Sequence, residues 1–310
     1  MLLSVLHQTT YRYAPAVELA QHMAHLKLRD TPAQHVLETG LAIEPMPATL
    51  QEQRDAFGNL RSYFTIEGRH QTLQLRAASR VRTREQAPPL PAAAASVGWE
   101  QVREHFRFRA GAPYDAAVEF SFASPHVQAD PAFAALAQKD FLPGRALLDA
   151  SCALMRRIHR DMRYVSQSTD VHTPAQHALQ RGEGVCQDFA HIFLSCLRQL
   201  GLAARYVSGY LLTTPPPGQA RLLGADASHA WVAVWLPLPE GEPAGAGIWV
   251  DLDPTNDRWG VGAPGADYIT LAWGRDYSDV SPLRGVIRGG ARHQLEVAVT
   301  VQGLPEDLPS

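Results

Sequence analysis

The chain has 310 residues and a mass of 34.0 kDa, more than one average domain needs, so we expect two folded units. Its 28 Lys and Arg and 31 Asp and Glu give a formal charge of -3 without a block of like charge, which argues against a nucleic-acid-binding protein. Its apolar runs are far shorter than the roughly 18 residues of a membrane helix, which argues against a membrane-spanning protein.

The cysteines and the N-terminus bear on the compartment. Cys152, Cys186 and Cys196 are too few for a disulfide framework and form no CxxC pair. The first seven residues have neither a basic segment nor an apolar stretch long enough for a secretory signal. We therefore expect a cytoplasmic protein without a disulfide scaffold.

Residues 1–85 are predicted to form an all-β domain. Their apolar and polar residues alternate with the period of a strand, and no long helical pattern interrupts them. Asp55–Asn59 signals a turn, because Gly and Asn tolerate positive φ. The predicted strands are 2–13, 36–43, 60–66 and 73–81.

Residues 86–98 are predicted to be a linker, because this stretch is rich in Pro and Ala and cannot pair as an interior strand. The second predicted domain, residues 99–310, begins with helices. They are expected at 131–138 and 146–159, and after a loop from residue 170 a short helix is expected to end near 180.

The strongest helical pattern starts at Cys186, where apolar side chains recur at the spacing of one helix face as far as residue 200. Asp188 and His191 flank this stripe and are predicted to lie on solvated faces. The strands that follow are expected at 203–212, 229–236 and 248–252, with a last one at 294–301. This order predicts an α+β fold in which the helix packs on an antiparallel sheet.

Cys186 is a candidate nucleophile because of its place in that helix. The N-terminus of a helix carries partial positive charge and unpaired N–H groups. Such an environment favours the thiolate, the form of cysteine that attacks carbonyls, and the N–H groups can stabilise the resulting oxyanion. The competing interpretation is that Cys186 is only the first residue of the apolar stripe and packs in the core.

A nucleophilic cysteine needs a base, and the base needs an orienting group. His229 begins one predicted strand and Asp253 ends the next. If these strands are antiparallel neighbours, the two residues lie side by side at one edge of the sheet. Alternation places Asp251 and Asp253 on the same face, so periodicity does not choose between the two aspartates.

Three segments carry a family resemblance: GVCQDFAHIF, SHAWVAVWLP and IWVDLDPTN. Within about residues 150–260 they resemble the core of the transglutaminase-like superfamily, in its bacterial branch of candidate cysteine proteases. HQTTYRYAPAVELAQH and RDAFGNLRSYF resemble the N-terminal β domain of that branch, and GRDYSDVSPLRGVIRGGARHQLEV resembles its tail.

The resemblance implies a papain/transglutaminase-like core preceded by an all-β N-terminal domain. It also implies a Cys-His-Asp triad of Cys186, His229 and Asp253, because the aspartate before Pro-Thr is the triad member. Relatives place an aromatic residue that assists the oxyanion near the position of Tyr164. The alternatives are that backbone N–H groups alone stabilise the oxyanion and that Tyr164 is simply a buried tyrosine. The family often has a His shortly before the GRDY segment, where this chain has Asp267, Tyr268 and Ile269.

These residues predict a thiol enzyme that acts on amide bonds of peptides or proteins through a thioester intermediate. Hydrolysis, by a cysteine peptidase or amidase, is the favoured reaction. The alternatives are a protein-glutamine gamma-glutamyltransferase and a catalytically silent scaffold. We expect no cofactor and no metal: there is no HExxH and no EF-hand pattern, and the spacing of His172, His177 and His191 does not suit one coordination shell. We expect no nucleic-acid or membrane partner, and homo-oligomerisation stays open.

Overall fold

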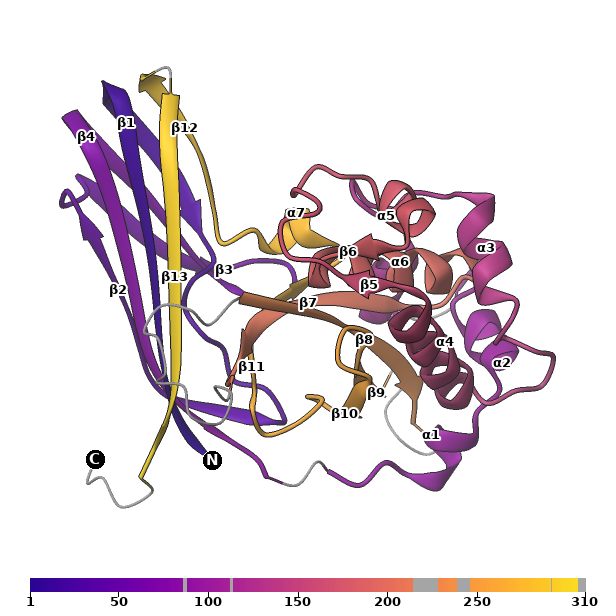
Figure 1. Ribbon diagram of the computed structural model, residues 1–310. Coiled ribbons are helices and arrows are strands. Elements are labelled where there is room, and N and C mark those ends of the chain that lie inside the picture. Colours follow the sequence, from indigo (N-terminus) through magenta and orange to yellow (C-terminus); the bar gives the residue numbers. More distant parts are fainter. Residues whose placement is uncertain (86–87, 112–113, 214–227, 239–245, 291, 306–310) are drawn as a thin grey trace, which may run out of the picture.

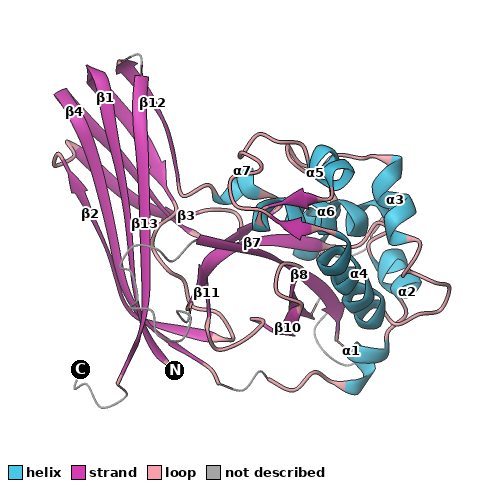
Figure 2. Ribbon diagram, viewed as in Figure 1, coloured by secondary structure: helices cyan, strands magenta, loops and turns pink. Residues whose placement is uncertain are grey.

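The computed structural model of the protein describes residues 1–85, 88–111, 114–213, 228–238, 246–290 and 292–305 (Figure 1). A sheet of long strands stands on one side, a five-stranded sheet lies next to it, and helices cover the far side (Figure 2). The predicted fold class, a helix on an antiparallel sheet preceded by a β domain, is confirmed.

The first sheet contains both the first strand and the last described strand of the chain. Its strands are antiparallel and comprise β1 (Leu2–Ala24), β2 (Gln34–Glu44), β3 (Thr49–Arg54), β4 (Leu60–Thr83), β12 (Leu283–Gly289) and β13 (Arg292–Leu304). β13 pairs with the first half of β1 and β12 with the second half. The strand predicted at 294–301 is thus present within β13, and it lies in the N-terminal sheet.

β4 is one strand where the sequence predicts two. The residues between the predicted pieces stay paired with β1, since Glu67 lies opposite Leu19 and His70 opposite Val17. Gly68 has a φ of +97° and absorbs the irregularity at this point of the ladder. The apparent break is therefore a local distortion within a continuous strand.

The second sheet has the order β10-β9-β8-β7-β11, with all neighbours antiparallel. Its strands are β7 (Ala204–Leu211), β8 (Ser228–Pro237), β9 (Gly247–Asp253), β10 (Arg258–Val261) and β11 (Tyr268–Gly274). The sequence predicts β7, β8 and β9 but not β10 or β11. β11 is buried along its length, so it lacks the alternation that marks a half-exposed strand.

The helix that begins at Cys186 is α6 (Cys186–Gln199), and it packs against β7 and β8. The other helices are α1 (Ala92–Ser96), α2 (Trp99–His105), η1 (Ala116–Ser121), α3 (Pro131–Ala137), α4 (Leu147–Asp161), α5 (Ala175–Arg181) and α7 (Tyr277–Val280). α1 lies within the predicted linker, and residues 86–87 of that linker lie outside the described residues. Two short strands, β5 (Arg163–Tyr164) and β6 (Glu183–Gly184), pair in parallel beside α6.

One hydrophobic core runs across both units. Leu3, Val81 and Val301 of the N-terminal sheet belong to the same buried cluster as Phe189 and Leu197 of α6. A separate cluster fills the far half of the N-terminal sheet. In the described part of the chain, no helix combines the length and the apolarity needed to cross a membrane.

Candidate active site

Secondary structure brings the three predicted site residues to one place. Cys186 is the first residue of α6 and is half-buried. His229 lies near the start of β8, and Asp253 is the last residue of β9. Since β8 and β9 are antiparallel neighbours, the start of one adjoins the end of the other.

The histidine ring contacts both other side chains. Its Nε2 donates to Oδ2 of Asp253 over 2.7 Å, and the Cys186 thiol lies within hydrogen-bond reach of the ring. Because Nε2 is occupied by the carboxylate, Nδ1 is the nitrogen left for the sulfur. The arrangement is thiol, imidazole and carboxylate in a row, the order that an activated cysteine requires.

Asp253 is fully buried and accepts hydrogen bonds on both oxygens. Oδ2 also receives the Tyr268 hydroxyl at 2.7 Å and the Asn256 side-chain amide at 2.7 Å. Oδ1 receives the backbone N–H of Thr255 at 2.8 Å. Burial alone would raise the pKa of Asp253, but His229 and these donors hold it below its ordinary value. The carboxylate is therefore kept ionised in the interior.

The same contacts act on His229. Burial by itself would lower its pKa, but the hydrogen bonds to Asp253 and Cys186, with the negative charges of both groups, raise it to about 10. An imidazolium is thus favoured at neutral pH in this position. A proton held on His229 is compatible with a thiolate on Cys186.

Asp251 has a different partner. Its Oδ1 accepts the indole N–H of Trp231 at 2.7 Å, and the positively charged Arg205 lies near it. Burial raises the pKa of Asp251 to about 6. Of the two aspartates that alternation could not separate, Asp253 is the one bonded to His229.

A pocket of about 350 Å³ opens beside His229. Tyr164 is on its rim, is 50% exposed, and has its pKa raised by burial and by the charge of Cys186. β5 fixes this tyrosine opposite Gly184, two residues before Cys186. The lining residues are Tyr164, Leu211, Thr213, Ser228, His229, Thr255 and Asn256.

Asp188 anchors the start of α6. Its Oδ2 accepts the backbone N–H of Val185 at 2.8 Å and the hydroxyl of Thr169. The prediction that Asp188 and His191 are solvated is wrong: each is 1% exposed, because α3, α4 and α5 cover the side of α6 that the sheet leaves open. His191 stacks on His126, with ring centroids 5.1 Å apart.

Gly184 leaves room for that anchor, and this gives a prediction. A Cβ at Gly184 would lie 2.7 Å from Asp188 Oδ2 and 2.8 Å from its Cβ. We expect Gly184→Ala to lower the stability by about 2 kcal/mol, as overpacking does, and to displace Cys186. Thermal denaturation measures the first effect and Cys186 alkylation the second. Gly40→Ala is the matched control, since its Cβ would meet no atom within 4 Å; equal melting temperatures for both variants would contradict the prediction.

The two other cysteines, and the three histidines whose spacing was considered for a metal site, differ from Cys186 and His229 in their surroundings. Cys152 and Cys196 are buried, and burial raises the pKa of each thiol, that of Cys152 to about 11. His172 and His177 are exposed, whereas His191 is buried in the core. Within the described ranges, no three His, Cys, Asp or Glu side chains converge as a metal site would require.

Sequence reasoning missed two residues at Asp253. Asn256 stands directly after the Asp-Pro-Thr segment, so its proximity in the chain was an available signal. Tyr268 occupies the region where the sequence departs from the family pattern, and its contact with Asp253 depends on how β11 pairs in the sheet.

Comparisons with known proteins cover both parts of the chain. The profile of the Transglutaminase-like superfamily matches residues 135–254, and that of the Bacterial transglutaminase-like N-terminal region matches residues 3–82. The uncharacterized protein Rv2569c of Mycobacterium tuberculosis is 39% identical over 302 residues, which cover 96% of this chain and 91% of that protein. The uncharacterized protein ML0607 of Mycobacterium leprae is 29% identical over 307 residues, 97% of this chain and 98% of its own length.

A solved structure extends the comparison to the whole fold. A candidate cysteine protease from Cytophaga hutchinsonii superposes with a TM-score of 0.70 at 20% identity, covering 100% of this chain and 92% of that one. The likeness at this identity concerns the fold. With both profiles matched in the expected order, and with Cys186, His229 and Asp253 inside the core match, the chain belongs to the transglutaminase-like superfamily and carries the N-terminal region of its bacterial branch.

Proposed function

We propose that this protein is a cysteine peptidase or amidase that cleaves amide bonds of peptides or proteins through a triad of Cys186, His229 and Asp253. The observation that carries the proposal is the row of contacts from the Cys186 thiol through the His229 ring to Asp253, whose Oδ2 lies 2.7 Å from Nε2. The pocket beside His229 leaves this row open to a substrate.

In the first half of the reaction, the Cys186 sulfur attacks the amide carbonyl carbon and the carbonyl electron pair moves to oxygen. N–H groups at the start of α6 are suited to stabilise that oxyanion, and the Tyr164 hydroxyl on the pocket rim is a second candidate donor. When the intermediate collapses, the C–N bond breaks and the leaving amine takes the proton of His229. A thioester on Cys186 remains.

In the second half, His229 accepts a proton from a water molecule whose oxygen attacks the thioester carbonyl. The C–S bond then breaks, the carboxylic acid leaves, and the thiolate–imidazolium pair is restored. Asp253 holds Nε2–H throughout, so that Nδ1 faces the reaction. An amine in place of water would make the same thioester react as an acyltransferase intermediate.

The choice between water and an amine is open to direct measurement. Incubation with a labelled amine and a panel of amide donors should release ammonia or peptide faster than it incorporates the amine. Incorporation that outpaces release would identify an acyltransferase and overturn the hydrolase assignment.

A catalytically silent scaffold is tested by the pH dependence of alkylation. Because the raised pKa of His229 keeps the imidazolium from acidic pH up to about 10, iodoacetamide should label Cys186 rapidly already at pH 6. In His229→Ala the labelling should follow an ordinary thiol, with a midpoint at about 8.5. Peptide mass spectrometry assigns the label. Identical profiles for the two proteins would mean that the histidine does not ionise the sulfur.

A further inference from the structure

β11 is an edge strand, and the N-terminal domain pairs with its free edge through side chains. Gln34, at the start of β2, is buried; its Oε1 accepts the N–H of Thr270 at 2.8 Å and its Nε2 donates to the carbonyl of Thr270 at 2.7 Å. A carboxamide thus takes the place of a neighbouring strand. This satisfies polar groups that an edge strand otherwise leaves unpaired.

Asn59 repeats the same contact three residues further along β11. Its Oδ1 accepts the N–H of Trp273 at 3.0 Å and its Nδ2 donates to the carbonyl of Trp273 at 2.7 Å. The register of β11 on β7 shifts between Thr270 and Ala272, so Trp273 turns its polar groups outward in place of Ala272. Two amides from one domain therefore hold one strand of the other.

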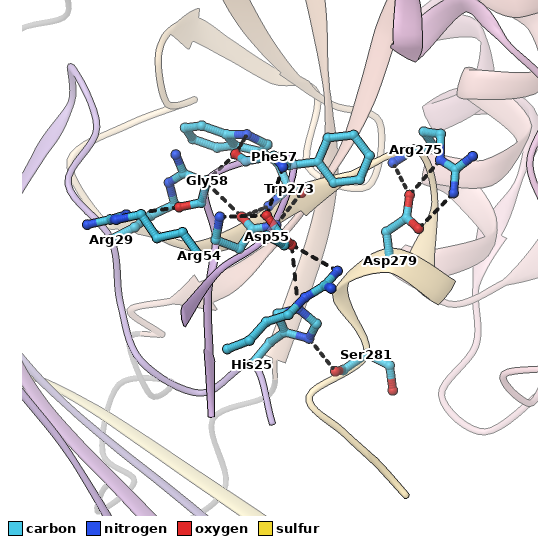
Figure 3. A network of polar contacts seen from close by, with 12 residues as sticks. His25, Arg29, Arg54, Asp55, Phe57, Gly58, Trp273, Arg275, Asp279 and Ser281 are labelled. Carbon is cyan, nitrogen blue, oxygen red and sulfur yellow. Dashed lines mark hydrogen bonds and ion pairs between the residues drawn. The ribbon is translucent and has the colours of Figure 1, made fainter. Parts of the chain in front are cut away.

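The turn that carries Asn59 is itself fixed (Figure 3). Asp55 accepts from the Asn59 amide at 2.9 Å, and its Oδ2 lies 3.1 Å from Arg61 and 3.7 Å from His25. Burial opposes ionisation, but these hydrogen bonds and the charge of Arg61 hold the pKa of Asp55 at about 2. Asn59 is thus presented to β11 by an ionised, buried cluster.

Tyr268 lies within the segment that these contacts hold. Two residues before it, the carbonyl of Ala266 accepts the hydroxyl of Thr83 at 2.6 Å, and two residues after it stands Thr270 with Gln34. The Tyr268 hydroxyl donates to Oδ2 of Asp253, the same oxygen that His229 binds. The path from the N-terminal domain to the carboxylate therefore passes through one short stretch of backbone.

We propose that the N-terminal domain is a positioning part of the active site: Gln34, with Thr83 and Asn59, fixes the segment from which Tyr268 orients Asp253. This inference rests on the proposed function. It assigns the N-terminal domain a task at the reaction centre, even though the lining of the pocket beside His229 comes from the second unit. Gln34 and Tyr268 are positioning residues in this scheme.

The test compares the rate of Cys186 alkylation between pH 5 and 9 in the full-length protein for Gln34→Ala, Tyr268→Phe and the double variant. At pH 6 we expect the rate to fall about 10-fold in Tyr268→Phe and about 5-fold in Gln34→Ala. The double variant should fall no further than Tyr268→Phe, because coupled residues are not additive. Thr39→Ala is the control: it removes a 2.8 Å hydrogen bond to Ser79 within the N-terminal sheet and should leave the profile unchanged.

An unchanged pH profile in Gln34→Ala, or effects that multiply in the double variant, would overturn the inference and leave the proposed function intact. Wild-type and His229→Ala proteins that label alike would overturn the proposed function and the inference with it. If Gln34→Ala does not fold, Gln34→Met replaces it, since it preserves the side-chain length. If neither variant folds, Gln34 has a role in folding alone and the inference is wrong.

Discussion

Replacing Cys186 with alanine is expected to lower the rate of amide hydrolysis at least about 1,000-fold, because the covalent route disappears with the sulfur. Cys186 is half-buried at the open end of α6, so the change removes few packing contacts. The melting temperature should therefore stay close to that of the wild type. Steady-state kinetics on the best donor from the amide panel, together with thermal denaturation, measure the two quantities.

The matched control is Cys196→Ala on the same helix. Cys196 is fully buried, so its truncation should lower the melting temperature while kcat per folded molecule stays within about threefold of the wild type. We therefore expect Cys186→Ala to lose activity and keep its stability, and Cys196→Ala to lose stability and keep its activity. Residual activity in Cys186→Ala that matches the wild type would place the nucleophile elsewhere.

The sequence predicts α6 well, because a helix packed on a sheet repeats apolar residues at a period that no strand shares. Cys186 is the first residue of both the predicted and the observed helix. β11 and β12 escape prediction for opposite reasons. β11 is buried except at the half-buried Trp273, whereas β12 is half-buried or exposed throughout, so neither shows the alternation of a strand with one face in the core.

The candidate site divides in the same way. His229 and Asp253 are predictable because antiparallel neighbours bring a strand's start beside the next strand's end, and the family resemblance selects between two aspartates. The contacts of Tyr268 and Gln34 cannot be predicted from the sequence, because each joins segments that only the tertiary fold brings together. A polar side chain that pairs with a distant backbone leaves no periodic mark in its own segment.

The N-terminal unit also shows contacts that its predicted strands do not reveal. Its sequence predicts a separate β domain, yet its residues share a core with α6 and its amides pair with β11. Evolutionary or engineered exchange of this domain would have to preserve Gln34 and Asn59 as well as the apolar face. The unit is a sheet of its own that shares a core with α6 and bonds through side chains to the edge of the sheet that carries the proposed triad.

Asp253→Asn is the second large effect that we expect, with kcat lowered about 1,000-fold or more. Oδ2 of Asp253 accepts from His229, Asn256 and Tyr268. An amide nitrogen in its place is itself a donor, so it would face three donors and no acceptor. If the amide oxygen instead occupies that position, its nitrogen meets the Thr255 N–H. In both orientations the imidazolium loses its negative partner. In the first, Nε2 must also accept from the amide, so the neutral ring carries its proton on Nδ1 and cannot take the proton of the thiol.

Asp251→Asn, on the same face of β9, is the matched control: it removes a negative charge in the core and leaves the carboxylate of Asp253 in place. Its Oδ1 can still accept the Trp231 indole, but Arg205 loses the carboxylate beside it and remains a buried charge. We therefore expect a lower melting temperature and a kcat within about threefold of the wild type, measured well below the unfolding transition. A loss of kcat in Asp251→Asn as large as that in Asp253→Asn would show that His229 depends on the negative charge of the strand and not on one oriented carboxylate.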